Sequence, residues 1–235
     1  MASSPKRHSS TRVGVAAVVV VFLLVVGGPF VYFHFIQSEP PPKLSLETTP
    51  VPSSAVGGTR APLAGTWKVA SDSLVRYRVK ETLFGQSGTA VGKTNSVTGS
   101  MTIAGNKVTT ATFSVDMTTF TSDESQRDDQ FQNRIMDTAD FPTATFTLTS
   151  PIDLGAVPKD GVQKTYAATG KLQLHGTTNA VTFTLATRRT GNVIAVQGTE
   201  PITFSEYGID NPSGGPANVG DSGLLEFVLQ LHPGK

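Results

Sequence analysis

Few side chains in this 235-residue chain have the types and spacing that catalysis or metal binding requires. The chain has no cysteine, which excludes a thiol nucleophile, a thiolate metal site and a disulfide framework. Its four histidines never pair at metal-ligand spacing, and no Gly-x-Ser-x-Gly nucleophile motif occurs. The sequence therefore predicts a protein that is not an enzyme and that needs no metal or cofactor.

Of the four histidines, only His175 lies in the body of the long region of alternating sequence after residue 63, because His232 lies in its C-terminal tail. His175 precedes Gly176 in a predicted tight turn. A histidine there can hydrogen-bond nearby backbone, contact the head group of a ligand, or take part in catalysis. The formal net charge of +1 comes without a basic block, which excludes a nucleic-acid partner.

The apolar residues of this region alternate with threonine and charged residues, which is the period of a half-buried strand. Turn signals separate the runs, and we expect strands near 66–70, 73–81, 94–103, 107–118, 143–150, 163–174, 180–189 and 193–205, with a further one near 223–232. This pattern predicts an all-β domain, either an antiparallel sandwich or a closed barrel of about eight strands.

One segment breaks the alternation and predicts a short helix over about 122–137. Thr121 and Glu124 have the spacing of a capping box, and Phe131 and Ile135 follow one helical turn apart. The helix should end before Phe141-Pro142, because a residue that precedes proline avoids helical geometry. On a barrel, such a helix would cover an open end or a flank.

The N-terminal residues predict a membrane anchor. Residues 13–36 carry no Asp, Glu, Lys or Arg, and about 20 apolar residues suffice to cross a bilayer as a helix. A cleaved signal peptide and a buried soluble helix are the alternatives. Lys6, Arg7 and Arg12 precede the span, so residues 1–12 should be cytoplasmic. Residues 37–62 then form a Pro-rich, disordered linker to an extracytoplasmic domain, 63–235, at the cell membrane.

The order of several motifs in the domain resembles the YceI-like family of exported lipid-binding proteins. The resemblance is carried by Trp67-Lys68-Val69, Ser73-Leu74-Val75, Val97-Thr98-Gly99-Ser100-Met101, Thr121 with Arg127-Asp128, Met136-Asp137, Phe141-Pro142, Thr145-Phe146, the segment from Gly170 to Thr178, and Tyr207-Gly208-Ile209. It implies a lipocalin-like antiparallel barrel that holds an isoprenoid or fatty-acid-like chain. The chain departs from the family pattern at Gln130-Phe131, where His-Leu is common, and at Phe204-Ser205, where an arginine is common.

The inward face of the predicted strands supplies the candidate ligand-binding residues: Tyr77, Val79, Met101, Ile103, Phe113, Val115, Phe146, Leu148, Leu172, Leu174, Phe183, Leu185 and Phe227. The alternation alone leaves a plugged core and a hollow bore equally open, and the resemblance implies the hollow bore. It also singles out Arg127 and Asp128, with His175, as candidates for the mouth or for contact with a head group. Otherwise the charges near Arg127 are interpreted as the solvated face of the helix.

Two functions follow from these expectations. The first is a membrane-tethered binding protein that sequesters or transports a long-chain lipid. The alternative is a cell-envelope interaction domain whose barrel is a scaffold without a ligand.

Overall fold

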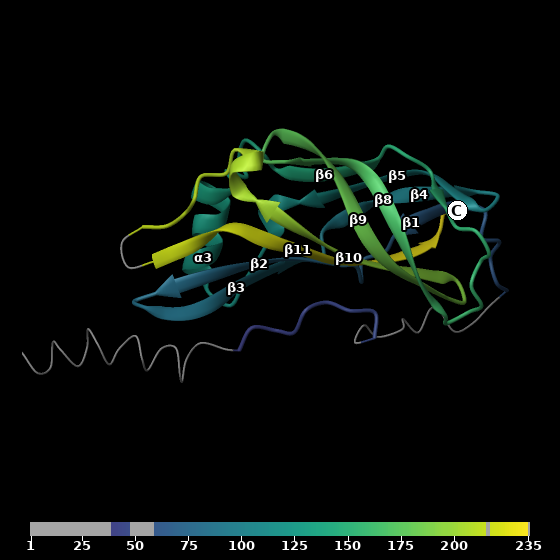
Figure 1. Ribbon diagram of the computed structural model, residues 1–235, viewed down its shortest axis with the longest axis horizontal. Coiled ribbons are helices and arrows are strands. Elements are labelled where there is room, and N and C mark those ends of the chain that lie inside the picture. Colours follow the sequence, from purple (N-terminus) through teal and green to yellow (C-terminus); the bar gives the residue numbers. More distant parts are fainter. Residues whose placement is uncertain (1–38, 48–58, 215–216, 235) are drawn as a thin grey trace, which may run out of the picture.

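The computed structural model describes residues 39–47, 59–214 and 217–234 (Figure 1). The predicted cytoplasmic tail, 1–12, and the predicted span, 13–36, lie outside these residues. In the part of the chain that the structure describes, no helix combines the length and the apolarity needed to cross a bilayer.

The described strands form one antiparallel sheet that closes on itself, which confirms the predicted barrel. The strands are β1 (Gly65–Val69), β2 (Leu74–Leu83), β3 (Gln86–Thr94), β4 (Val97–Ala104), β5 (Lys107–Asp116), β6 (Thr143–Leu148), β7 (Ile152–Asp153), β8 (Gln163–Leu174), β9 (Thr177–Thr190), β10 (Val193–Thr203) and β11 (Ala217–Pro233). Eight of them run in the order β1-β4-β5-β6-β8-β9-β10-β11, and β1 pairs with β11 to close the ring. Within this ring of eight, closure pairs each strand on both sides.

The strand β11 is long enough to pair with both β1 and β2. Its last residues face β1, with Trp67 opposite Pro233, and its earlier residues face β2, with Val75 opposite Phe227. The β2–β3 hairpin therefore extends the wall of the barrel at one end, where Leu83 pairs with Gln86 (Figure 1). Trp67 is buried at the other end and donates a hydrogen bond of 2.8 Å to the Leu63 carbonyl.

The sequence analysis missed β3 because this strand lacks the alternation of large apolar and polar residues. Small residues occupy its inward face, and Gly92 lies directly opposite Tyr77. A Cβ atom at Gly92 would lie 2.2 Å from the Tyr77 ring, so the ring requires glycine at this position. β11 also begins earlier than predicted, with a register shift against β2 between Val219 and Gly223.

The predicted helix exists but is shorter, and its predicted cap is wrong. The helix α3 spans Ser125–Gln130 and continues as one π-helical turn, η5, over Phe131–Ile135. Thr121 cannot be the N-cap because its backbone forms a β-bridge with Lys93. Instead the Asp128 carboxylate accepts hydrogen bonds from Ser122 N (2.7 Å) and Ser122 Oγ (2.6 Å), which fixes the entry to the helix.

Residues 39–47, which we call the strap, pack against the outer wall of the barrel. This differs from the expectation of a disordered linker over 37–62. Leu46 is 2% exposed and packs with Ala195 and Val228, because the outer wall is apolar there. Arg188 Nη2 donates to the Leu46 carbonyl at 2.8 Å, and Arg78 Nη2 donates to the Pro41 carbonyl at 2.6 Å.

Candidate functional site

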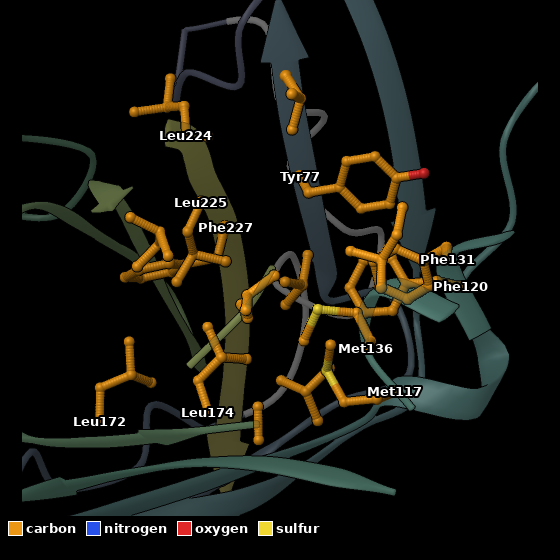
Figure 2. A pocket seen from close by; sticks show the side chains of 18 of the residues that line it. Tyr77, Met117, Phe120, Phe131, Met136, Leu172, Leu174, Leu224, Leu225 and Phe227 are labelled. Atoms are coloured by element: carbon orange, nitrogen blue, oxygen red, sulfur yellow. The ribbon is translucent and has the colours of Figure 1, made fainter. Parts of the chain in front are cut away.

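The end of the barrel that carries the β2–β3 hairpin contains a cavity of about 300 Å³, the first cavity. Figure 2 shows its side chains converging from opposite walls, with Leu172 and Leu174 of β8 on one side and Tyr77 of β2 on another. The lining is apolar except at the hairpin end, where Glu81, Arg127 and Gln130 contribute. We call the part lined by Glu81, Arg127 and Val219 the mouth.

A second cavity of about 110 Å³ lies at the opposite end of the barrel. Its lining includes Met101 and Ile103 of β4 and Leu154, Val157 and Val162 of the connection between β7 and β8. Five residues line both cavities and therefore mark their boundary: Phe113, Phe146, Ala168, Leu185 and Val196. The interior is thus hollow at both ends and narrowed between them.

Three phenylalanines narrow the bore near this boundary. The Phe183 ring contacts Phe146 edge to face at a centroid distance of 5.2 Å and Phe227 at 5.4 Å. Phe227 pairs across the sheet with Gly198, and a Cβ atom at Gly198 would lie 2.5 Å from Phe227 Cζ. The missing side chain therefore lets the Phe227 ring lie close to the wall, which limits how far this ring narrows the bore.

A cluster of aromatic rings joins the helical segment to β2 beside the first cavity. Tyr77 stacks on Phe131, with ring centroids 4.8 Å apart and planes at 10°, and Phe120 lies 5.2 Å from Phe131 (Figure 2). Burial, and to a lesser extent nearby carboxylates, raises the pKa of the Tyr77 phenol, whereas Arg127 opposes this shift. The phenol therefore stays neutral at physiological pH, as an apolar cavity wall requires.

Arg127 brings a charge to the mouth, and two carboxylates neutralise it. Its guanidinium pairs with Glu81 at 3.3 Å, from Nη2 to Oε1, and with Asp123. Burial alone would lower the pKa of Arg127, but the charges of Glu81 and Asp123 raise it. Arg127 therefore links the helix to β2 by ion pairs, with no unpaired positive charge directed into the cavity.

The structure places the thirteen predicted bore residues around these two cavities. Ten line the first cavity, namely Tyr77, Val79, Phe113, Val115, Phe146, Leu172, Leu174, Phe183, Leu185 and Phe227. Met101, Ile103 and Leu148 line the second cavity instead. The alternation therefore identifies the inward face correctly, although it could not reveal the boundary between the cavities.

The three predicted mouth residues lie in different environments. Arg127 lines the first cavity, whereas the Asp128 carboxylate bonds Ser122 at the start of the helix. His175 has a positive φ of 49° in the β8–β9 turn, where its Nδ1 lies 3.3 Å from the Tyr207 carbonyl oxygen. Its ring also contacts Phe141, with centroids 4.6 Å apart. These contacts hold the His175 side chain in the turn, and His175 is not among the residues that line the two cavities.

The sequence analysis missed several lining residues. Met117, Phe120, Phe131 and Met136 come from the segment between β5 and β6, and Leu224 and Leu225 come from β11, just after its register shift against β2. Phe131 and Ile135 have helical spacing, which was the one signal of an apolar helical face. Among the described residues, His, Asp and Glu form no group of three that could hold a metal ion.

The fold is similar to solved structures of low sequence identity. A polyisoprenoid-binding domain from Saccharophagus degradans, implicated in plant cell wall breakdown, is 18% identical, with 73% of this chain and 99% of that chain covered and a TM-score of 0.59. BcnA from Burkholderia cenocepacia is 21% identical, with 69% and 98% covered and a TM-score of 0.55. A comparison with curated protein sequences gives no match.

The comparison with family models adds sequence evidence to this likeness of fold. The model of the YceI-like domain matches residues 67–231, from the tryptophan that begins the barrel wall to the last inward leucine of β11. That range contains all the strands of the closed ring apart from the outermost residues of β1 and β11, together with both aromatic clusters of the interior. A match over this much of the chain means that the protein belongs to the YceI-like family.

Proposed function

We propose that this protein binds the apolar chain of an isoprenoid or fatty-acid-like lipid in its barrel, for sequestration or transport. The observation that carries the proposal is the first cavity, about 300 Å³ in volume with an almost wholly apolar lining. Contact between water and a cavity lining of Phe, Leu and Val is unfavourable. An apolar chain is therefore the ligand that gains most free energy from entering this cavity.

The energetics of burial favour a long chain. Each buried methylene contributes about 0.8 kcal/mol, so several isoprene units contribute on the order of 10 kcal/mol before the cost of ordering the chain. The polyisoprenoid-binding domain of Saccharophagus degradans has the same fold, which supports this class of ligand. Because Arg127 is paired with Glu81 and Asp123, the apolar chain rather than an anionic head group should dominate affinity.

We also propose that the barrel works at the extracytoplasmic surface of a membrane, tethered by residues 13–36. The support for this part is the sequence itself, with 24 uncharged residues preceded by Lys6, Arg7 and Arg12. A tethered lipid carrier would exchange its ligand with the adjacent bilayer without diffusing away.

A scaffold without a ligand is the competing function, and filling the bore distinguishes the two. Ala168 is 2% exposed, lines both cavities and lies opposite Phe183, whereas its neighbour Ala167 is exposed and lies opposite Thr184. An Ala168→Phe substitution places a ring inside the bore, and Ala167→Phe places the same ring outside it. The purified full-length variants are extracted with organic solvent, and the lipid is quantified by mass spectrometry.

We expect wild type and Ala167→Phe to carry a long-chain lipid and Ala168→Phe to lose at least nine-tenths of it. Should Ala168→Phe fail to fold, Val196→Phe fills the same boundary from β10. A wild-type protein without lipid, or a folded bore-filled variant that keeps its lipid, would establish the scaffold function instead.

A further inference from the structure

The strap shows toward which end of the barrel its own N-terminal residues run. Leu46 packs on Val228, which pairs with Leu74 at the beginning of β2. Pro42 lies further along this strand, where its carbonyl accepts a hydrogen bond from Arg76 at 3.3 Å, and the Pro41 carbonyl accepts one from Arg78. The strap therefore runs toward the β2–β3 hairpin as its residue numbers fall (Figure 1).

The length of chain between the strap and residue 36 limits how far the hairpin can lie from a bilayer that holds residues 13–36. From Ile36 to Pro41 the chain advances five residues, which reach at most about 18 Å when fully extended. From Arg78 to Leu83, β2 also advances five residues, or about 17 Å, in the same direction. A bilayer that contains residues 13–36 would therefore lie within reach of the hairpin tip.

The residue at this tip is poorly suited to its turn and well suited to an apolar partner. Phe84 is 54% exposed and has a φ of +50°, followed by Gly85 at +79°. Two-residue turns of this kind favour Asn-Gly, because a bulky side chain with positive φ is strained. Phe84 thus opposes formation of the turn while presenting an aromatic ring to the surroundings.

Exposed apolar residues also occur at the opposite end, where Val157 is 48% and Val162 is 49% exposed. Apolar exposure alone therefore does not distinguish the two ends of the barrel. The strap does distinguish them, because its N-terminal residues lie beside β2 and run toward the hairpin end.

We propose that the β2–β3 hairpin tip, with Phe84 at its centre, docks into the surface of the lipid bilayer and turns the mouth of the first cavity toward the membrane. The proposal rests on the proposed tether and lipid cargo. Lipid would then pass between bilayer and bore beside Glu81 and Val219, which line the cavity near this tip, without crossing bulk water.

The absence of cysteine makes single-cysteine labelling a direct test. The full-length protein is reconstituted into phosphatidylcholine vesicles with an apolar, environment-sensitive fluorophore. The fluorophore takes the place of the aromatic ring at Phe84→Cys or, as the matched control, labels Val157→Cys. Lipids that carry a quencher on the acyl chain report contact with the bilayer. We expect at least threefold stronger quenching at position 84 than at 157, and equal or reversed quenching would overturn the proposal.

Two further variants separate docking from loss of folding. In the first variant the label is moved to the exposed position Gln86→Cys, and Phe84→Asn removes the ring. We expect quenching to weaken at least twofold. The melting temperature should stay equal or rise, because Asn-Gly suits the turn. With the label at Phe84→Cys, Leu46→Asp should release the strap and reduce the difference between positions 84 and 157. Unchanged quenching in both variants would contradict the docking.

The same vesicles distinguish the failure of docking from the failure of the tether. A protein that alkaline carbonate washes from the vesicles lacks a spanning segment, so both the tether and the docking would be wrong. A protein that resists the wash but shows no quenching at position 84 keeps the tether and loses only the docking.

Discussion

At the scale of single residues, the interior depends on pairs of an aromatic residue and a glycine. The Phe227 ring lies over Gly198, and the Tyr77 ring lies over Gly92, each across one pair of strands. An aromatic ring set over a glycine covers the backbone and stays near the wall. Large side chains can therefore face inward without filling the bore, which explains how a phenylalanine-rich barrel remains hollow.

This arrangement predicts the effect of adding one methyl group to the wall. Gly198→Ala places a Cβ 2.5 Å from Phe227 Cζ, and the ring can yield only toward the bore. We expect a loss of about 1–3 kcal/mol in the free energy of unfolding, measured by urea denaturation, together with reduced lipid content. Thr199→Ala, on the other face, should change the free energy by less than about 0.5 kcal/mol. Unaltered lipid content in Gly198→Ala would show that the Phe227 ring does not limit the bore.

Tyr77 predicts a pH dependence at high pH. Its pKa is raised above 10.0 mainly by burial, so the folded protein holds the phenolic proton more tightly than the unfolded chain does. This contribution to stability is complete below pH 10 and is lost as the pH rises toward the folded-state pKa. Between pH 10 and 12, wild type should lose stability more steeply than Tyr77→Phe, by up to about 1.4 kcal/mol per pH unit. Parallel pH profiles in urea denaturation would disprove this role of burial.

At the scale of elements, the segment between β5 and β6 lines the first cavity and contributes Arg127 to its mouth. Its helix α3 contributes Arg127, which pairs with Glu81 of β2, and the following turn η5 contributes Phe131, which stacks on Tyr77. The short helix exposes most of its surface, and its stability depends on these contacts with β2 because an isolated helix of this length is unstable. The segment is therefore suited to open locally while the barrel stays closed.

Removing the central ring of this segment should loosen the mouth. Phe131 is 8% exposed, and Phe131→Ala should lower the free energy of unfolding by about 3 kcal/mol. We expect lipid transfer to acceptor vesicles to become at least several-fold faster. The exposed Asn133→Ala provides the control and should leave both quantities near wild type. A destabilised Phe131→Ala with an unchanged transfer rate would mean that lipid enters by another route.

At the scale of the whole molecule, the alternation predicted an all-β sandwich or barrel, because one-faced alternation follows directly from the burial of one face of a sheet. The resemblance to the YceI-like family then implied the barrel. The sequence analysis missed β3, because its small residues leave room for the Tyr77 ring of the neighbouring strand and follow no local pattern. It assigned the helix cap to Thr121, because the competing bridge is to Lys93, which is distant in the sequence. The docking of Leu46 on Val228 is likewise a long-range contact that the Pro-rich composition of the linker conceals.

The residues of the candidate site likewise include some that the sequence predicts and some that it does not. The inward residues of the strands follow from periodicity, so Phe146, Leu172 and Phe183 could be named from the sequence. Phe120 and Met136 reach the cavity from irregular segments, where no period relates position to direction. The pairing of Arg127 with Glu81 depends on how the helix packs on β2, so the sequence could place Arg127 at the mouth without identifying its partner.

Native mass spectrometry of the intact protein tests most directly whether the bore holds a lipid. Phe183 is 3% exposed and lies between Phe146 and Phe227, whereas Thr184 faces solvent on the same strand. A carboxylate inside the bore would have to lose its hydration against the lipid chain, at a cost of several kcal/mol. We predict a one-to-one lipid complex for wild type and Thr184→Asp, and ligand-free protein for a folded Phe183→Asp. A wild type that carries no lipid, or a folded Phe183→Asp that retains it, would contradict lipid binding in the bore.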